Sequence, residues 1–265
     1  MTGVYIALSY FDLIIVSTLL LLAGMISIWQ RLGVERALGI AALRTVIQLV
    51  LIGYVLKILF AMTSPLWTAI AAVIMVALAG REATARQQTR LNGGWSYAIA
   101  TSSLMMGATL VTAVALVAVI RPEPWFDPRF ALPLLGMMLG NTLNGVAVGM
   151  ERLISTIKRE KIAIEARLLL GHSRVDAMRD YVRESSRAGL MHIINAMSAA
   201  GIISLPGMMT GQILAGVSPT EAVKYQIMIM FLLAGATAIG VLLATTLTAR
   251  RLSDERERLR LDRMN

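Results

Sequence analysis

The stretch LNGGWSYAIATSSLMMGATLVTAVALVAVI, residues 91–120, contains no Asp, Glu, Lys or Arg. Two further uncharged stretches cover residues 130–150 and 188–220. A helix of about 20 apolar residues is long enough to cross the hydrocarbon core of a membrane. Charged residues make up 15% of the 265 and hydrophobic residues 57%, whereas soluble domains carry about 25% charged residues. The sequence therefore predicts an all-α, polytopic membrane protein in which residues 1–265 form a single transmembrane domain.

Working outward from these stretches, we expect about seven membrane-crossing helices. Their expected ranges are 6–29, 37–60, 66–80, 97–120, 130–150, 189–215 and 222–249. Asp12 and the absence of a basic N-terminal region argue against a cleaved signal peptide in the first segment.

Basic residues are concentrated in every second connection and in the C-terminal segment, while connections 61–65, 121–129 and 216–220 contain few of them. The positive-inside rule then places the N-terminus outside and the C-terminus in the cytoplasm. It also accounts for the net charge of +9 without nucleic-acid binding. Residues 151–188 and the tail 250–265 are expected to be cytoplasmic, the tail as a solvated extension of the last helix.

The sequence lacks the usual signatures of an enzyme. It contains neither GxxxxGK[ST] nor HExxH, and it has no cysteine, which excludes disulfides, thiolate ligands and a cysteine nucleophile. Its histidines are His172 and His192, and we interpret His192 as a hydrogen-bonded packing residue. We expect no enzymatic activity and assign no metal site.

Proline interrupts the segment 189–215. Pro206 lies in Leu205-Pro206-Gly207 and removes a backbone donor, so the helix should be kinked or broken there. Two interpretations stay open: a tolerated kink, or a discontinuous helix that lines a transport pathway. Met208 and Met209 follow directly, among 17 methionines that we attribute to packing rather than to ligation of a soft ion.

Several polar residues lie within the expected spans. Arg44 and Gln48 are one helical turn apart, and Arg44 either lines a pathway or extends to the head groups. Asn141 and Asn144 either line a cavity or hydrogen-bond between helices. Near the outer surface, Asp12 and Lys57 are expected to pair.

The cytoplasmic interval predicts a helix, a sharp turn and a second helix. Ile154, Ile157, Ile164 and Leu168 recur at helical spacing, Gly171 permits the turn, and a charged helix should cover 175–186. This pair either docks into a groove on a partner or lies on the lipid surface.

The same interval resembles the coupling loop of ABC transporter permeases, whose motif begins Glu-Ala-Ala and places Gly after three further residues. Glu165, Ala166 and Gly171 match that spacing, with Leu169 between them, whereas Arg167 replaces the second Ala. The hydrophobic-x-Leu-Pro ending is absent near 181–184.

A wider resemblance rests on four segments, residues 47–57, 136–141, 204–211 and 222–228. They are similar to the Fet-type iron-export permeases, a family with plant relatives implicated in aluminium tolerance. The resemblance implies a homodimeric permease of the cell inner (plasma) membrane. It also implies that a separate ABC ATPase subunit supplies the ATP and Mg²⁺ chemistry and drives a metal ion, iron, outward. Candidate pathway residues are then Arg44, Gln48, Asn141, Asn144, Pro206, Met208, Met209 and Gln226.

Two other classes of function fit the residues. One is a stand-alone transporter or channel driven by an ion gradient, although the scarcity of membrane-buried carboxylates argues against proton coupling. The other is a non-transporting scaffold that recruits a cytoplasmic partner, in which Asn141 and Pro206 would be dispensable.

Overall fold

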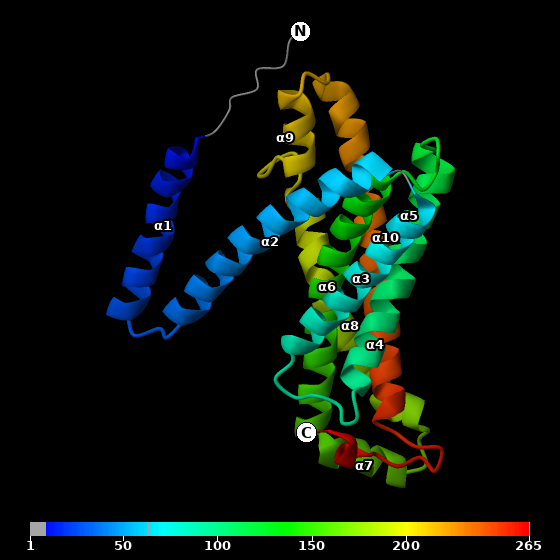
Figure 1. The fold of residues 1–265 in the computed structure, drawn as a ribbon. Coiled ribbons are helices and arrows are strands. Elements are labelled where there is room, and N and C mark those ends of the chain that lie inside the picture. The colour runs from blue at the N-terminus through cyan, green and yellow to red at the C-terminus, as the bar shows by residue number, and fades with distance from the viewer. Residues whose placement is uncertain (1–8, 63, 265) are drawn as a thin grey trace.

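The computed structural model describes residues 9–62 and 64–264, and these residues form helices joined by short connections, without a β-sheet (Figure 1). The N-terminal half contains α1 (Tyr10–Trp29), α2 (Glu35–Met62), α3 (Pro65–Ala85), α4 (Trp95–Leu104), the π-helix η1 (Met105–Thr109), α5 (Leu110–Val114) and the π-helix η2 (Ala115–Ile120). The C-terminal half contains α6 (Pro128–Arg159), α7 (Lys161–Leu169), α8 (Arg174–Ala199), α9 (Gly207–Leu214), α10 (Pro219–Arg251) and the 3₁₀-helix η3 (Leu261–Arg263).

Six helical stretches of the described chain are long and apolar enough to cross a membrane: Phe11–Trp29, Glu35–Met62, Pro65–Ala85, Trp95–Ile120, Pro128–Arg159 and Pro219–Arg251. They coincide with six of the seven expected segments, which confirms the polytopic, helical fold; residues 6–8 of the first segment lie outside the described residues. The remaining segment, 189–215, is divided. Helix α8 ends at Ala199, and α9 begins at Gly207. The count of seven crossings and the orientation stay predictions.

The predicted interruption at Pro206 is a complete break. Residues 200–206 form a non-helical turn in which Gly201 has φ +82°, and Pro206 occupies the N-cap position of α9 with extended backbone. Proline at this point costs no intrahelical hydrogen bond, because the first N–H groups of a helix have no partner within it. The proline therefore ends the connection and starts a new short helix.

The centre of the bundle is built from α6, α8 and α10, with α3 and α4 packed outside them. Small residues let α6 and α8 approach closely. A Cβ built on Gly189 would lie 2.7 Å from the carbonyl oxygen of Gly145 and 2.9 Å from a methyl group of Val241 on α10. Gly145 and Gly149 form a Gly-x-x-x-Gly pair on α6, the pattern by which membrane helices pack without intervening side chains.

The stretch Trp95–Ile120 is one helical rod that contains two π-helical turns. Gly107 lies in the first of them, where a built Cβ would be 2.6 Å from the carbonyl oxygen of Ala236 on α10. The wider turn and the missing side chain together bring this rod against α10 at backbone distance.

Helices α1 and α2 stand apart from the other helices over much of their length (Figure 1). Leu59 is the buried hydrophobic residue of α2, and most apolar side chains of α1 are exposed. Ser27 joins the two helices by donating to Glu35 at 2.9 Å. Their apolar surfaces match lipid contact rather than a water-facing role.

Two expectations for segments near the ends of the predicted crossings are corrected. The amphipathic helix expected from Ile154 to Leu168 is two helices, because α6 ends at Arg159 and α7 begins at Lys161. Asp12 does not pair with Lys57 within the described chain; its carboxylate accepts from the Ser9 N–H at 2.8 Å and caps α1. That local hydrogen bond needs no partner from another helix.

Candidate functional site

A cavity of about 830 Å³ opens between α2 and α3. We call it the α2/α3 cavity, and it brings together Arg44, Thr45, Gln48, Arg81, Glu82 and Arg86. The carboxylate of Glu82 pairs with two of these arginines, at 3.3 Å from Arg44 Nη2 and 3.6 Å from Arg86 Nε. Arg44 and Gln48 therefore share one polar cavity, and Arg44 is joined to α3 through Glu82.

A second cavity, of about 590 Å³, lies between α6 and α8 and is lined by Asn144, Glu151, Arg152 and His192 among others. Arg86 lines both cavities, and its Nη1 donates to Asn144 Oδ1 at 2.5 Å. The ion pairs and this hydrogen bond form a continuous polar chain from α2 through α3 to α6. We call this second space the α6/α8 cavity.

Asn141 does not belong to this chain. Its Nδ2 donates to the carbonyl oxygen of Met137 on the same helix at 3.0 Å, and it lines neither cavity. The spacing of Asn141 and Asn144 places them on neighbouring positions of α6, but only Asn144 reaches a partner on another segment.

A third cavity, of about 520 Å³, lies where α8, α9 and α10 meet. It brings together three residues predicted for the pathway, Pro206, Met209 and Gln226, and it also contains Met197 and Met230. Gln226 is 8% exposed, and its Oε1 has no hydrogen-bond partner within the described chain. Met208 does not line this cavity and packs against the hydrophobic core. The residues described by the structure contain no cluster of three His, Asp or Glu side chains placed to hold a metal ion.

Helix α7 presents two apolar faces at the end of the bundle that also holds the C-terminal segment (Figure 1). Ile164 is fully buried and Leu168 packs against the core. On the opposite face Ile162 and Leu169 are 82% and 89% exposed, and Ala166 between them is also exposed. We call Ile162, Ala166 and Leu169 the α7 stripe. It is apolar surface on a helix that also carries Lys161, Glu165 and Arg167.

The turn from α7 into α8 requires glycine. Gly171 has φ +89°, a left-handed conformation that side chains disfavour. Arg167 then joins the two helices, because its Nη1 lies 3.1 Å from Asp180 Oδ2 and its guanidinium lies 5.8 Å from the centroid of the Tyr181 ring. Glu165 pairs with Lys161 at 3.8 Å on the same helix. Arg167, which departs from the coupling-loop motif, thus holds α7 against α8.

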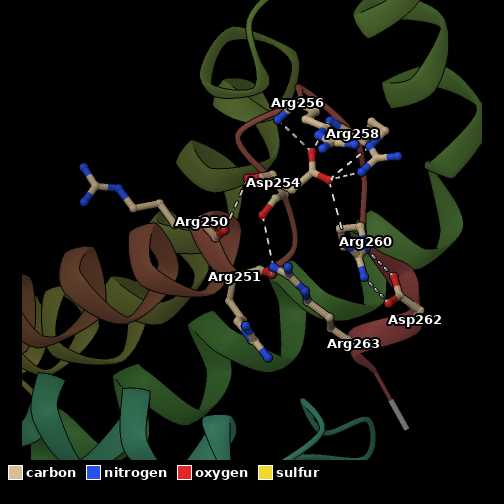
Figure 2. A network of polar contacts seen from close by, with 9 residues as sticks. Arg250, Arg251, Asp254, Arg256, Arg258, Arg260, Asp262 and Arg263 are labelled. Atoms are coloured by element: carbon tan, nitrogen blue, oxygen red, sulfur yellow. Dashed lines mark hydrogen bonds and ion pairs between the residues drawn. The ribbon is translucent and has the colours of Figure 1, made fainter.

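The C-terminal tail is not an extension of the last helix, contrary to the expectation. Helix α10 ends at Arg251, and residues 252–264 fold back across the ends of the helices (Figure 2). Leu252 is fully buried, Arg263 Nη1 donates to the carbonyl oxygen of Arg251 at 2.8 Å, and the Asn92 N–H donates to the carbonyl oxygen of Arg263 at 2.8 Å. These contacts hold residues 252–264 against the rest of the bundle, whereas a solvated extension of α10 would make no such contacts.

Charged groups within the tail reinforce this fold. Asp254 lies 2.9 Å from Arg258 and 3.7 Å from Arg260 (Figure 2). Arg260 also forms a two-bond pair with Asp262, at 2.7 and 2.8 Å, which lowers the pKa of Asp262 to about 2. Arg251 lies 4.3 Å from the centroid of the Trp95 ring and so connects the end of α10 to the start of α4.

The sequence reasoning missed Glu82 and the bridging position of Arg86. Both fall in the basic connection after the expected third span, which ends at residue 80, whereas α3 continues to Ala85. A usable signal was present: Glu82 and Arg86 are four residues apart, the spacing of ion pairs on one helical face.

Comparison with known proteins places the chain in a family. The model of the "Uncharacterised protein family (UPF0014)" matches residues 10–253. The chain is 35% identical to the UPF0014 membrane protein slr1647 of Synechocystis, covering 87% of this chain and 88% of the relative. It is 32% identical to Protein ALUMINUM SENSITIVE 3 of Arabidopsis thaliana, covering 86% and 81%.

It is also 30% identical to the Probable iron export permease protein FetB of Escherichia coli, covering 91% of each chain. No solved structure matches the chain. The resemblance inferred from the four sequence segments is therefore confirmed. The chain belongs to the UPF0014 family of multi-pass membrane proteins, which includes this iron export permease.

Proposed function

We propose that the chain is the permease subunit of an ABC-type exporter in the cell inner membrane. A separate ATPase subunit, which binds ATP and Mg²⁺, would drive a metal ion, iron, out of the cytoplasm. Support comes from membership of a family that includes an iron export permease and from the resemblance of 165–171 to a coupling loop. A homodimer is part of the proposal, because two ATPase subunits need two docking positions.

The α7 stripe is the observation that carries the proposal. Exposed Ile162 and Leu169 lie on a helix whose other face is held by Ile164. Apolar anchors at helical spacing are the feature by which a helix binds in a groove of another protein. In the proposed orientation α7 is cytoplasmic, where an ATPase would meet it.

The route for a cation would begin in the α6/α8 cavity. Asn144, Glu151 and His192 offer oxygen and nitrogen ligand atoms there, and such ligands suit Fe(II) better than thioethers do. The two arginines that line the same cavity, Arg86 and Arg152, are each paired with a glutamate. The absence of a tight ligand cluster among the described residues is compatible with passage of the ion rather than its storage.

The test is copurification of the detergent-solubilised chain from its native host. Wild type should retain a subunit with a P-loop, and Leu169→Glu should lose it. Ile202→Glu is a matched control, because Ile202 is 88% exposed in the turn before α9. Helix α9 lies at the other end of the bundle from α7 (Figure 1). Loss in both variants, or in neither, would contradict docking at the α7 stripe.

The substrate needs a separate assay. Inside-out membrane vesicles that contain both subunits should take up Fe(II) only when ATP is added. Uptake without ATP or the ATPase would favour a stand-alone transporter, and no uptake under either condition would favour a scaffold.

A further inference from the structure

The α2/α3 cavity has an excess of positive charge. Arg44, Arg81 and Arg86 line it, and Glu82 is its one acidic residue. Both oxygens of Glu82 are already engaged, Oε2 by Arg44 and Oε1 by Arg86. A metal cation entering this cavity would therefore meet three guanidinium groups and a carboxylate that is already paired.

Most of the hydrogen-bond donors of these arginines are unused. A guanidinium has five N–H donors. Arg44 donates one hydrogen bond, from Nη2 to Glu82, and Arg86 donates one, from Nη1 to Asn144, while its Nε only approaches Glu82 as an ion pair at 3.6 Å. Arg81 has no hydrogen-bond or ion-pair partner among the described residues. Thr45 and Gln48 add neutral polar groups to the same wall. Guanidinium groups bind phosphate oxygens by paired hydrogen bonds, so a cavity of this composition matches a phosphate group.

The position of the cavity along the helices fits the same ligand. Arg44 lies nine residues after Glu35, the first residue of α2, which is about 14 Å at 1.5 Å per residue. Apolar side chains of both helices, including Leu43, Ile47 and Leu78, are exposed beside it. Basic pockets between membrane helices on the cytoplasmic side, where the predicted orientation places this cavity, bind anionic lipid head groups.

We propose that the α2/α3 cavity is a binding site for a phosphate-bearing anion, held by Arg44, Arg81 and Arg86. The phosphate is supplied either by a lipid head group or by a soluble phosphate compound. Glu82 orients Arg44 and Arg86 and at the same time limits the affinity of the site by its own negative charge. The proposal goes beyond metal export and does not depend on it.

The test uses the purified full-length chain without an ATPase, so that it is independent of the exporter proposal. Native mass spectrometry would compare retention of phosphatidylglycerol with that of phosphatidylcholine, and calorimetry in lipid-free detergent would measure inorganic pyrophosphate. We expect one of the two phosphate probes to bind. Preferential retention of phosphatidylglycerol identifies a lipid source, and pyrophosphate binding identifies a soluble one.

Two variants and a control test the residues. Replacing Arg44, Arg81 and Arg86 by Gln should weaken binding at least about tenfold, since several charged hydrogen bonds are lost. The control replaces the exposed Arg36, Arg90 and Arg187 by Gln, which changes the net charge equally outside the cavity. Glu82→Gln should strengthen binding, an effect opposite to that of a purely structural loss.

Mn²⁺, observed by electron paramagnetic resonance, tests the opposite site. Mn²⁺ binding that Glu82→Gln abolishes would overturn the proposal, because it would show a cation site. The proposal also fails if neither phosphate probe binds wild type, if the cavity triple variant binds like the control triple variant, or if Glu82→Gln does not strengthen binding.

Discussion

The close contact between α6 and α8 predicts opposite effects for the same substitution at different glycines. In Gly189→Ala the new methyl group would lie 2.7 Å from the carbonyl oxygen of Gly145, and in Gly145→Ala it would lie 2.9 Å from that of Gly189. Ordinary C···O contacts are about 3.3 Å or longer, so the helices must move apart by roughly half an ångström. Methyl groups of Thr237 and Val241 are also within 2.9 Å, and rotation of those side chains could relieve their contacts. The contact with a backbone carbonyl oxygen remains, because no side-chain rotation moves that atom.

Overpacking of this kind costs about 1–3 kcal/mol, whereas Gly→Ala within a helix gains about 0.5–1 kcal/mol. The two ranges give a net loss of about 0–2.5 kcal/mol for each variant, with a central value of about 1 kcal/mol. At about 2–4 °C per kcal/mol for a chain near this size, the central value lowers the midpoint of thermal unfolding by about 2–4 °C. Intrinsic tryptophan fluorescence in detergent would report it, since the chain has 4 Trp.

Gly140→Ala is the matched control, because Gly140 lies on the same helix as Gly145 and a built Cβ meets nothing within 4 Å. This variant should be as stable as wild type or slightly more stable. If Gly189→Ala and Gly140→Ala shift the midpoint in the same upward direction, α6 and α8 are not in backbone contact and the reasoning is refuted.

Two further predictions concern the segments at the α7 end of the bundle. The pKa of Asp262 is about 2 because of its bonds to Arg260, so this residue stabilises the folded tail fully above its ordinary pKa of 3.8, and the stabilisation is lost as pH falls through 2. Pepsin should therefore cleave residues 252–264 at a higher pH in Arg260→Gln than in wild type. Identical pH profiles of cleavage for the two proteins would contradict the pairing. Gly171→Ala should raise the rate of amide hydrogen exchange in residues 168–174, because a non-glycine residue at φ +89° is strained by about 1 kcal/mol. Gly171→Asn should raise the exchange rate less, since Asn tolerates left-handed φ. Equal exchange rates in the two variants would show that the turn does not depend on this conformation.

The membrane fold could be predicted because hydrocarbon imposes a strong local rule. Long uncharged stretches such as 91–120 have to satisfy their backbone groups within the segment, and a helix does so. Composition alone therefore located the rod Trp95–Ile120 to within two residues. The break at Pro206 was likewise local, because a proline removes its hydrogen bond wherever the neighbouring helices lie.

The polar sites depend on pairing between helices, which a single sequence does not specify. Nothing in the neighbours of Arg86 indicates that it reaches Asn144, 58 residues later. The tail illustrates the same limit, because its many arginines favour a solvated extension when the sequence is taken alone. In the structure, Asn92 and Trp95, from a distant part of the chain, contact Arg263 and Arg251. Gly145 and Gly189 lie in two different uncharged stretches of the sequence, and only the packed structure shows that they face each other.

Helix α8 offers a physical connection between the proposed docking helix and the α6/α8 cavity. It is continuous from Arg174 to Ala199, and Arg167 holds α7 to its first turns through Asp180. Further along, Gly189 contacts α6 at backbone distance and His192 lines the cavity. The contact between Gly189 and Gly145 contains no side chain that could change rotamer to accommodate a movement of α8. If an ATPase displaces α7, the movement of α8 is therefore passed on to α6. We therefore expect a displacement of α7 to alter the cavity beside His192, and such a change is the coupling that the proposed ATP-driven permease requires.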